Sequence, residues 1–332
     1  MRTEIFAAAA ALALSAILVP ASARADEALG VNSFAGASGI ATRVGQEQGF
    51  FHAKGLEVTL SHPKGSVDQF KGLVEGRYQV LITALDNVVA YHDGHGEADL
   101  GGPLDLVAVT GGDSGFLSLI AAPGTKSVAE LRGKTMVVDA LTTGFSFALQ
   151  ELLAEGGVPK DAVQYVTAGS SGARLAALTE GKAQGALLSI PFDLAAKNKG
   201  FVALETVAGR FGHYAATVTA VRRGWAKDHG ATIVGFIEAY RQSVRWFVAP
   251  DHKTAALALM HGEMPSVAEA ELPRIYAILA DRRTGLSRDL ALDRAGAERV
   301  LELRKRYAAP EARPAHPLKD YVDTSYLRKA QK

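Results

Sequence analysis

Short apolar runs alternate along the chain with longer segments in which apolar residues recur every three or four positions. The first pattern is typical of strands and the second of helices. In the first third we expect strands over 29–31, 56–60, 78–83 and 104–109, and helices over 40–51, 67–75 and 86–91. A second set follows, with strands over 116–122, 135–139, 163–167 and 183–188 and helices over 145–155, 173–180 and 192–197. Such alternation predicts mostly parallel sheets covered by helices.

Two glycine-containing segments interrupt this alternation, at 111–115 and at 207–212. We interpret them as the places where the chain crosses into a second lobe and returns. The return leads to a strand over 214–221 and then to a largely helical third. A chain above 300 residues also exceeds what one core usually accommodates. The predicted fold class is therefore α/β with two lobes, each a mixed, mostly parallel sheet with flanking helices. Residues 26–112 and 213–332 form one lobe, residues 113–212 form the other, and a ligand cleft lies between them.

The first 25 residues read as a secretory signal peptide. An apolar run over 5–20 follows Arg2, and small residues lead to the A-x-A site at Ala23-Arg24-Ala25. The run is shorter than the ~20 residues of a membrane span. We predict cleavage after Ala25 and a monomeric protein that is free in the bacterial periplasm rather than embedded in a membrane.

The net charge and the cysteine content exclude several classes of function. The 36 basic and 35 acidic residues give a net charge of +1, and removing residues 1–25 leaves 34 of each. Near-neutrality removes the phosphate attraction of most nucleic-acid binders, so we expect no nucleic-acid partner. The absence of cysteine excludes disulfides, thiol nucleophiles, cysteine-ligated zinc and iron–sulfur clusters. We expect no cofactor.

Several segments, in order along the chain, resemble the nitrate/sulfonate/taurine and thiamine-pyrimidine type of solute-binding proteins of ABC transporters. They lie at 45–58, 76–87, 131–145 and 172–186, and the closing segment 321–327 is similar as well. The resemblance implies a hinged, two-lobe type II periplasmic-binding fold. It also implies capture of a small organic molecule, such as a sulfonate, a pyrimidine-like or another aromatic compound. Delivery would be to a membrane permease that works with an ATPase.

Ligands of open α/β sheets bind at the carboxyl ends of the strands, where loops and helix N-termini converge. We therefore select the residues that follow the predicted strands at 29–31, 78–83, 135–139 and 183–188, together with the pair at the return crossing. These candidates are Asn32, Ser33, Phe34, Asp86, Asn87, Thr142, Thr143, Gly144, Phe145, Ser189, Phe192, His213 and Tyr214.

Each candidate also has a structural interpretation. Thr142-Thr143-Gly144 either holds an anion at a helix N-terminus or caps the helix over 145–155. Asp86 either binds a ligand donor or complements the helix dipole, and the aromatic candidates either line the site or belong to the core. Arg174 is interpreted as structural pairing, and Ser170 as a cap. Because the four selected loops contain no arginine, an organic ligand with donors and a ring suits them better than nitrate. We expect substitutions at Asp86 or Thr143 to weaken binding and to leave stability nearly unchanged.

Catalytic and metal-site alternatives are also considered. His92-Asp93-Gly94-His95 contains potential metal ligands, but the glycine-rich segment after a helix is interpreted as a solvated turn, and we expect no metal. The nucleophile tetrapeptide of trypsin-like proteases has the same sequence as residues 112–115. The match has no functional meaning here, because such a protease is all-β and this chain alternates strands with helices. We expect no catalysis. The alternatives are an enzyme similar to thiamine-pyrimidine synthase on the same fold, and a periplasmic ligand-sensing subunit.

Overall fold

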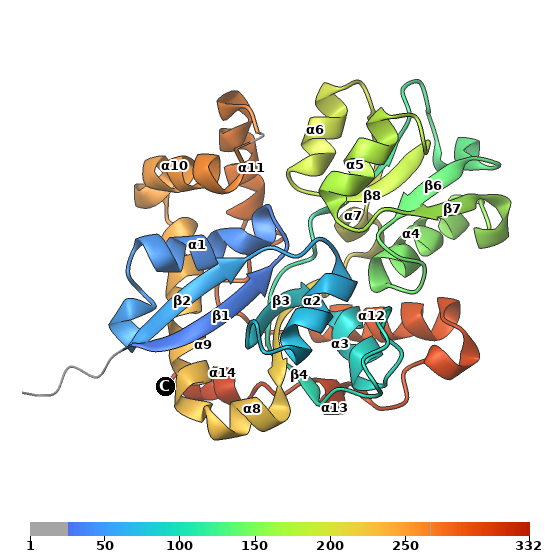
Figure 1. Cartoon of the computed structure of the whole chain (residues 1–332). Helices are drawn as coiled ribbons and strands as arrows, with labels where there is room; N and C mark the ends of the chain where they lie inside the picture. Colours follow the sequence, from blue (N-terminus) through green and yellow to red (C-terminus); the bar gives the residue numbers. More distant parts are fainter. Residues whose placement is uncertain (1–25, 266) are drawn as a thin grey trace, which may run out of the picture.

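The computed structural model describes residues 26–265 and 267–332, which form two five-stranded sheets covered by helices (Figure 1). The predicted signal peptide and its cleavage site lie outside the described residues. The first sheet has the order β2-β1-β3-β10-β4 and the second the order β7-β6-β8-β5-β9. The strands are β1 (Glu27–Ser33), β2 (Leu56–Ser61), β3 (Val80–Ala84), β4 (Leu106–Gly111), β5 (Leu117–Ala121), β6 (Thr135–Val138), β7 (Gln164–Thr167), β8 (Gly185–Ser189), β9 (Val202–Thr206) and β10 (Thr217–Arg222).

Helices connect and cover these strands. They are α1 (Ile40–Glu47), α2 (Ser66–Val74), α3 (Leu85–His92), α4 (Gly144–Glu155), α5 (Ser171–Thr179), α6 (Phe192–Asn198), α7 (Val207–Phe211), α8 (Arg223–Asp228), α9 (Gly230–Phe247), α10 (Lys253–Glu263), α11 (Leu272–Leu279), α12 (Arg294–Tyr307), α13 (Leu318–Tyr321) and α14 (Ser325–Ala330). Within the described ranges, no helix combines the length and apolar character that a membrane span requires.

The two sheets share one pattern. β1 pairs in parallel with β2 and β3, and β6 pairs in parallel with β7 and β8. In each sheet one strand is antiparallel to both of its neighbours. This strand is β10 in the first sheet and β5 in the second. In both cases it is the first strand that the chain forms after it crosses from the other sheet. The prediction of a two-lobe α/β fold with mixed, mostly parallel sheets is confirmed.

The two passages between the sheets lie side by side. The carbonyl oxygen of Asp113 accepts hydrogen bonds from the backbone N–H groups of Ala216 (3.0 Å) and Thr217 (3.2 Å). The Asp113 N–H in turn donates to Thr217 Oγ1 at 3.1 Å. Gly115 and Phe116 both adopt positive φ angles, 80° and 47°, where the chain turns into β5. Both connections between the lobes are therefore held together at one point.

The local structure adds detail at three places. The segment 207–212, interpreted as the return crossing, contains α7, which Thr206 caps by accepting a hydrogen bond from the Gly209 N–H at 3.1 Å. The preceding strand β9 escaped prediction because it is an edge strand whose residues are half-buried or exposed, so it lacks a clear apolar alternation. The helix expected over 40–51 ends at Glu47, and Gly49 continues with a φ of 69° that favours glycine.

The hydrophobic core continues across the two lobes. One apolar cluster joins residues of α3, α4 and α12, and a second packs β1–β3 against α1, α9, α10 and α11. Helix α12, drawn in red in Figure 1, lies against both α4 of the second lobe and α3 of the first. The C-terminal third thus does more than extend the first lobe, because its helix α12 contacts both.

Candidate ligand site between the lobes

A cavity of ≈ 130 Å³ lies between the two sheets. That is roughly ten water-sized volumes, enough for a small organic molecule. The first lobe lines it with Phe34, Ala35, Ser38, Pro63, Gly65, Ser66, Ile82, Thr83, Ala84, Asn87 and Thr217. The second lobe lines it with Gly115, Asp139, Thr143, Gly144, Phe145, Gly169, Ser170, Ser171, Arg174, Ser189 and Phe192. These residues lie mainly at or just after the carboxyl ends of the six parallel strands, where this class of sheet binds ligands.

Helix N-termini from both lobes point toward this cavity. The first residues or N-caps of α2, α3, α4, α5 and α6 all contribute to its lining. The unpaired N–H groups and dipoles at helix N-termini favour an electron-rich group nearby. The cavity is therefore suited to a ligand that carries a hydrogen-bond acceptor or an anionic group.

Seven of the thirteen predicted residues line the cavity: Phe34, Asn87, Thr143, Gly144, Phe145, Ser189 and Phe192. They come from both lobes, and the chain separates Phe34 from the second-lobe members by more than a hundred residues. The rule that ligands bind at the carboxyl ends of strands thus selected residues at the edge of each sheet that lines the cavity. That these side chains contact a ligand stays a prediction.

Two of the predicted residues belong to a strand and not to the loop that follows it. Asn32 and Ser33 belong to β1 itself and are buried. Asn32 donates to Ser61 Oγ at 2.9 Å and accepts from Gln69 Nε2 at 3.1 Å, which ties β1 to β2 and α2. Their selection as cavity residues is corrected, because the strand runs on to Ser33 and the loop begins only at Phe34.

Asp86 lies beneath the cavity rather than in it. Its carboxylate accepts a hydrogen bond from Arg304 Nη1 at 2.8 Å, and the two side chains are only 2% and 1% exposed. Burial raises the pKa of Asp86, and the positive charge of Arg304 opposes this effect. A Cβ atom on Gly144 would lie 2.4 Å from the Asp86 Cβ, so the second lobe closes directly over this carboxyl group. The selection of Asp86 as a ligand contact is corrected.

Three further predicted residues also have protein partners outside the cavity. The exposed Thr142 donates through its N–H and its hydroxyl to Glu97 Oε1, at 2.8 and 2.5 Å. The exposed His213 lies 3.0 Å from Asp293 Oδ2 at a separate surface hollow. The buried Tyr214 donates to the carbonyl oxygen of Gly144 at 3.2 Å. None of these three belongs to the cavity lining.

A seam of polar contacts, in which Asp86, Glu151, Tyr214 and Arg304 are buried, joins the lobes outside the cavity. We call it the α12 seam, formed by Asp86, Glu151, Tyr214, Arg304, Arg306 and Tyr307. Glu151 of α4 accepts hydrogen bonds from Arg306 Nη1 (2.6 Å) and Tyr307 Oη (2.5 Å). Although burial raises the pKa of Glu151, these donors hold it below its usual range. The charged groups of the seam therefore have protein partners.

Arg174 is a cavity residue that the sequence-based prediction treated only as structural. Its Nε donates to the Leu187 carbonyl (3.1 Å), its Nη1 to the Gly169 carbonyl (2.6 Å) and its Nη2 to Ser171 Oγ (2.8 Å). A guanidinium has five N–H groups, so two remain beyond these three partners in the described part of the chain. Arg174 thus has the expected structural role and also lines the cavity. The four selected loops contain no arginine, but α5 brings this arginine to the lining.

Asp139 is the other charged cavity residue. Thr143 Oγ1 donates to Asp139 Oδ1 at 2.8 Å and accepts from the Ser146 N–H at 3.3 Å. Thr143 therefore caps α4 and lines the cavity at the same time. Burial raises the pKa of Asp139, and the charge of Arg174 opposes this rise. The second lobe supplies both charged side chains of the lining, and the first lobe supplies none.

Hydroxyl groups complete the polar wall. Ser171 Oγ lies 3.0 Å from Ser189 Oγ and accepts from the Ser189 N–H at 3.3 Å, while Ser170 caps α5. Ser170 and Ser171 follow β7, a strand that the sequence analysis predicted but did not use for site selection. The same rule applied to that strand identifies both serines. Applied to β2, it identifies the lining residues Pro63, Gly65 and Ser66.

The fold and cavity define a two-lobe α/β protein of the periplasmic-binding type. A family model described as NMT1/THI5 like matches residues 40–253, well over half of the chain. The chain belongs to this family.

Solved structures with the same fold are mainly binding proteins. The periplasmic nitrate-binding protein NrtA from Synechocystis PCC 6803 is 12% identical, with a TM-score of 0.77 over 92% of this chain and 88% of that one. The alkanesulfonate-binding protein SsuA from Xanthomonas axonopodis pv. citri, bound to MOPS, is 13% identical, with a TM-score of 0.70 over 90% and 99%. The desulfurization enzyme DSZB is 14% identical, with a TM-score of 0.62 over 92% and 99%. No curated protein matches the sequence. At these identities the likeness shows the fold alone.

Proposed function

We propose that the chain is the periplasmic substrate-binding component of an ABC importer, which captures a small organic molecule between its lobes. The observation that carries this proposal is the cavity at the carboxyl ends of six parallel strands, lined from both lobes, in a member of the NMT1/THI5-like family. Binding between two lobes that close around a ligand is a recurrent mechanism of such folds.

The lining favours a ligand with two kinds of surface. Arg174, the serine hydroxyls and the helix N-termini suit an acceptor group such as a sulfonate, a carboxylate or a pyrimidine carbonyl. Phe34, Phe145 and Phe192 offer apolar or aromatic faces that a small inorganic anion cannot use. NrtA is named for nitrate and SsuA is bound to a ring-bearing sulfonate, and the phenylalanines favour the second type of ligand here.

Closure would occur about the paired crossings. In this proposal residues 26–112 and 213–332 move as one lobe and residues 113–212 as the other. The hydrogen bonds of Asp113 to Ala216 and Thr217 keep the two connections together and support a single hinge there. The closed lobes would then present one surface to a permease coupled to an ATPase, with the binding protein acting as a monomer.

Export is part of the same proposal. The neighbour NrtA is named a periplasmic nitrate-binding protein, and the first 25 residues have the pattern of a signal peptide. Intact-mass measurement of protein recovered from the periplasm should give a chain that begins at Asp26. A cytoplasmic location with an uncleaved N-terminus would contradict the export proposal.

Ligand identification tests the binding proposal. Native mass spectrometry of protein purified from its own periplasm should reveal a bound small molecule. A thermal-shift panel of sulfonates, pyrimidines, flavins and aromatic carboxylates should then raise the melting temperature for one class. At a ligand concentration of 100 Kd the stabilisation is about 2.7 kcal/mol. A protein that carries no ligand and responds to no member of the panel would contradict the proposal.

Two alternatives remain testable. DSZB is named an enzyme and has the same fold, which keeps a catalytic function open as an alternative. Turnover of an identified ligand by the purified protein, alone or with pyridoxal phosphate and iron, would establish that function, whereas recovery of intact ligand supports transport. Co-purification with a sensor kinase instead of a permease would favour a ligand-sensing subunit.

A further inference from the structure

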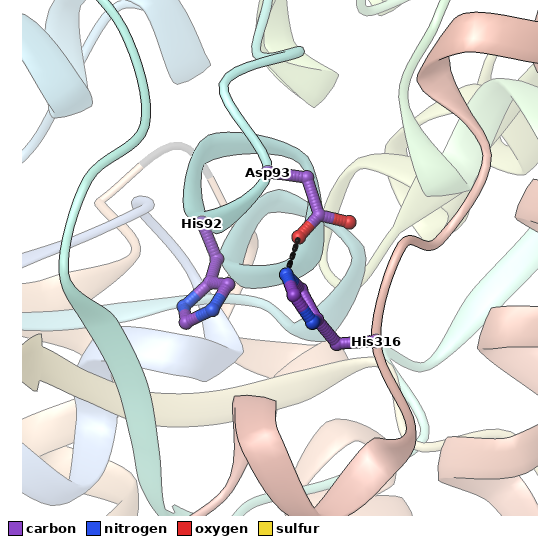
Figure 2. Close-up of side chains that lie close together, drawn as sticks. All are labelled: His92, Asp93 and His316. Carbon is purple, nitrogen blue, oxygen red and sulfur yellow. Dashed lines mark ion pairs between the residues drawn. The ribbon is translucent and has the colours of Figure 1, made fainter.

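A second polar cluster lies away from the cavity, at the C-terminal end of α3. His92 and Asp93 come from this helix end, and His316 comes from the segment between α12 and α13 (Figure 2). One ligand atom from each of the three side chains lies within 4.8 Å of the others. The sequence analysis considered His92 and His95 as potential metal ligands but interpreted their segment as a solvated turn. The fold brings a different histidine, His316, close to His92 and Asp93.

The surroundings fix the donor atoms. His92 Nδ1 lies 2.9 Å from the Leu106 carbonyl oxygen, which can only accept. Nδ1 must therefore carry the proton, and Nε2 keeps its lone pair in the neutral ring. A metal-binding histidine is held in this way, with one ring N–H donated to a backbone carbonyl and the other nitrogen free for the ion.

Asp93 is the most informative member. Its side chain is only 3% exposed, and its Oδ2 accepts from Tyr321 Oη (2.7 Å) and from the Ala315 N–H (2.9 Å). Its Oδ1 is buried and has no hydrogen-bond partner among the described residues. A buried carboxylate oxygen without a hydrogen-bond partner is destabilising, because it has lost its water and gained nothing in return. Something other than the described side chains is thus needed to satisfy this atom.

An ion pair with His316 does not fully meet this need. The distance from His316 Nε2 to Asp93 Oδ1 is 3.9 Å, too long for a hydrogen bond. In a tetrahedral zinc site with bonds of 2.0–2.2 Å, neighbouring ligand atoms lie about 3.4 Å apart. One ligand atom from each of the three side chains already lies within 4.8 Å of the others, and the half-exposed His316 ring has room to reorient toward an ion.

We propose that His92 Nε2, Asp93 Oδ1 and a ring nitrogen of His316 bind one Zn²⁺ ion, with water as the fourth ligand. Two imidazoles and one carboxylate suit zinc, whereas magnesium and calcium prefer all-oxygen sites. The ion would join the end of α3 to the proline-containing segment 309–317 and satisfy Asp93 Oδ1. This site is separate from the ligand cavity, to which α3 contributes Asn87 near its other end.

Zinc titration of the mature, full-length chain after EDTA treatment tests the proposal. Isothermal titration calorimetry should show one Zn²⁺ per chain, and zinc should raise the melting temperature. His316→Gln and Asp93→Asn should each weaken zinc binding by more than about 100-fold, since a direct ligand should matter more than an outer-shell partner. The control is His95→Gln, which changes the neighbouring histidine of the sequence motif and should bind like the wild type.

Spectroscopy of the wild type keeps the test independent of variant folding. The Co²⁺-substituted protein should show the strong visible absorption of a four-coordinate site, and X-ray absorption of the zinc form should show nitrogen and oxygen neighbours that include two imidazoles. Absence of stoichiometric zinc binding would overturn the proposal. So would unchanged affinity in His316→Gln, or a loss in His95→Gln that equals the loss in His316→Gln.

Discussion

The cavity and the α12 seam are two contacts between the same lobes, and they are built in opposite ways. The seam joins side chains of opposite charge, as in Asp86 with Arg304 and Glu151 with Arg306. In the cavity, two N–H groups of Arg174 remain beyond its three hydrogen-bond partners among the described residues. The difference teaches that a charged residue near a strand end, such as Asp86, can lie outside the cavity lining when an opposite charge from a distant segment pairs with it.

This contrast predicts that seam variants lose stability and cavity variants lose affinity. The largest effect should come from Asp86→Ala, which leaves Arg304 buried without its carboxylate. Removing one member of a buried pair costs about 3–5 kcal/mol, so the free energy of unfolding from urea titration should fall by that amount. This replaces the sequence-based expectation that substitution at Asp86 would leave stability nearly unchanged.

Leu141→Ala is the control for this variant, because Leu141 is 53% exposed and lies near the seam without belonging to it. Its free energy of unfolding should stay within about 0.5 kcal/mol of the wild type. Equal stability of Asp86→Ala and Leu141→Ala would show that the seam contributes nothing.

The next largest effect concerns the cavity. Phe34→Ala removes a half-buried ring from the first-lobe wall. Loss of its apolar contact should weaken ligand binding by about 1.5–3 kcal/mol, which is a tenfold to 100-fold rise in Kd. The free energy of unfolding without ligand should change far less than in Asp86→Ala. Calorimetry and urea titration on the same samples separate the two readouts, and a stability loss as large as that of Asp86→Ala would count against the contrast.

Thr143 both caps α4 and lines the cavity. Its substitution should therefore lower both stability and ligand affinity, each by a smaller amount than the variants above. Thr143→Ala removes the cap of α4 and the hydrogen bond to Asp139, and the cap alone contributes about 1 kcal/mol. Thr143→Ser keeps both hydroxyl contacts and should restore most of the stability. If the alanine and serine variants unfold at the same urea concentration, the hydroxyl has no capping role.

The smallest effect is a pH-dependent one at Asp139. Burial raises the pKa of this carboxyl group above 3.8, so the folded state binds its proton more tightly than the unfolded state. Below pH 3.8 the carboxyl group does not lower the free energy of unfolding. The destabilisation appears as the pH rises above 3.8 and is complete once the pH has passed the folded-state pKa. Asp139→Asn should therefore be slightly more stable than the wild type near neutral pH, and the difference should vanish in acid. Melting temperatures over a pH series measure it, and a difference that grows toward low pH would contradict the sign.

The sequence predicted the alternating elements, the two-lobe class and the edge of each sheet that lines the cavity, because these depend on local patterns. It could not predict the α12 seam. Arg304 lies 218 residues from Asp86 along the chain, and no local pattern relates the two. Arg174 was underestimated for a similar reason, since its position within α5 shows its pairing but not the cavity it faces. The proximity of His316 to His92 and Asp93 depends on the path of the C-terminal segment, which the sequence does not reveal.

The claim that one ligand contacts both walls of the cavity is tested most directly by calorimetric titration of an identified ligand. The proteins to compare are the wild type, Phe34→Ala from the first-lobe wall and Ser189→Ala from the second-lobe wall. The account predicts that each variant raises Kd for the same ligand by about tenfold or more while the unliganded protein stays folded. Wild-type affinity in either variant would contradict it, because the ligand would then not be held between the lobes.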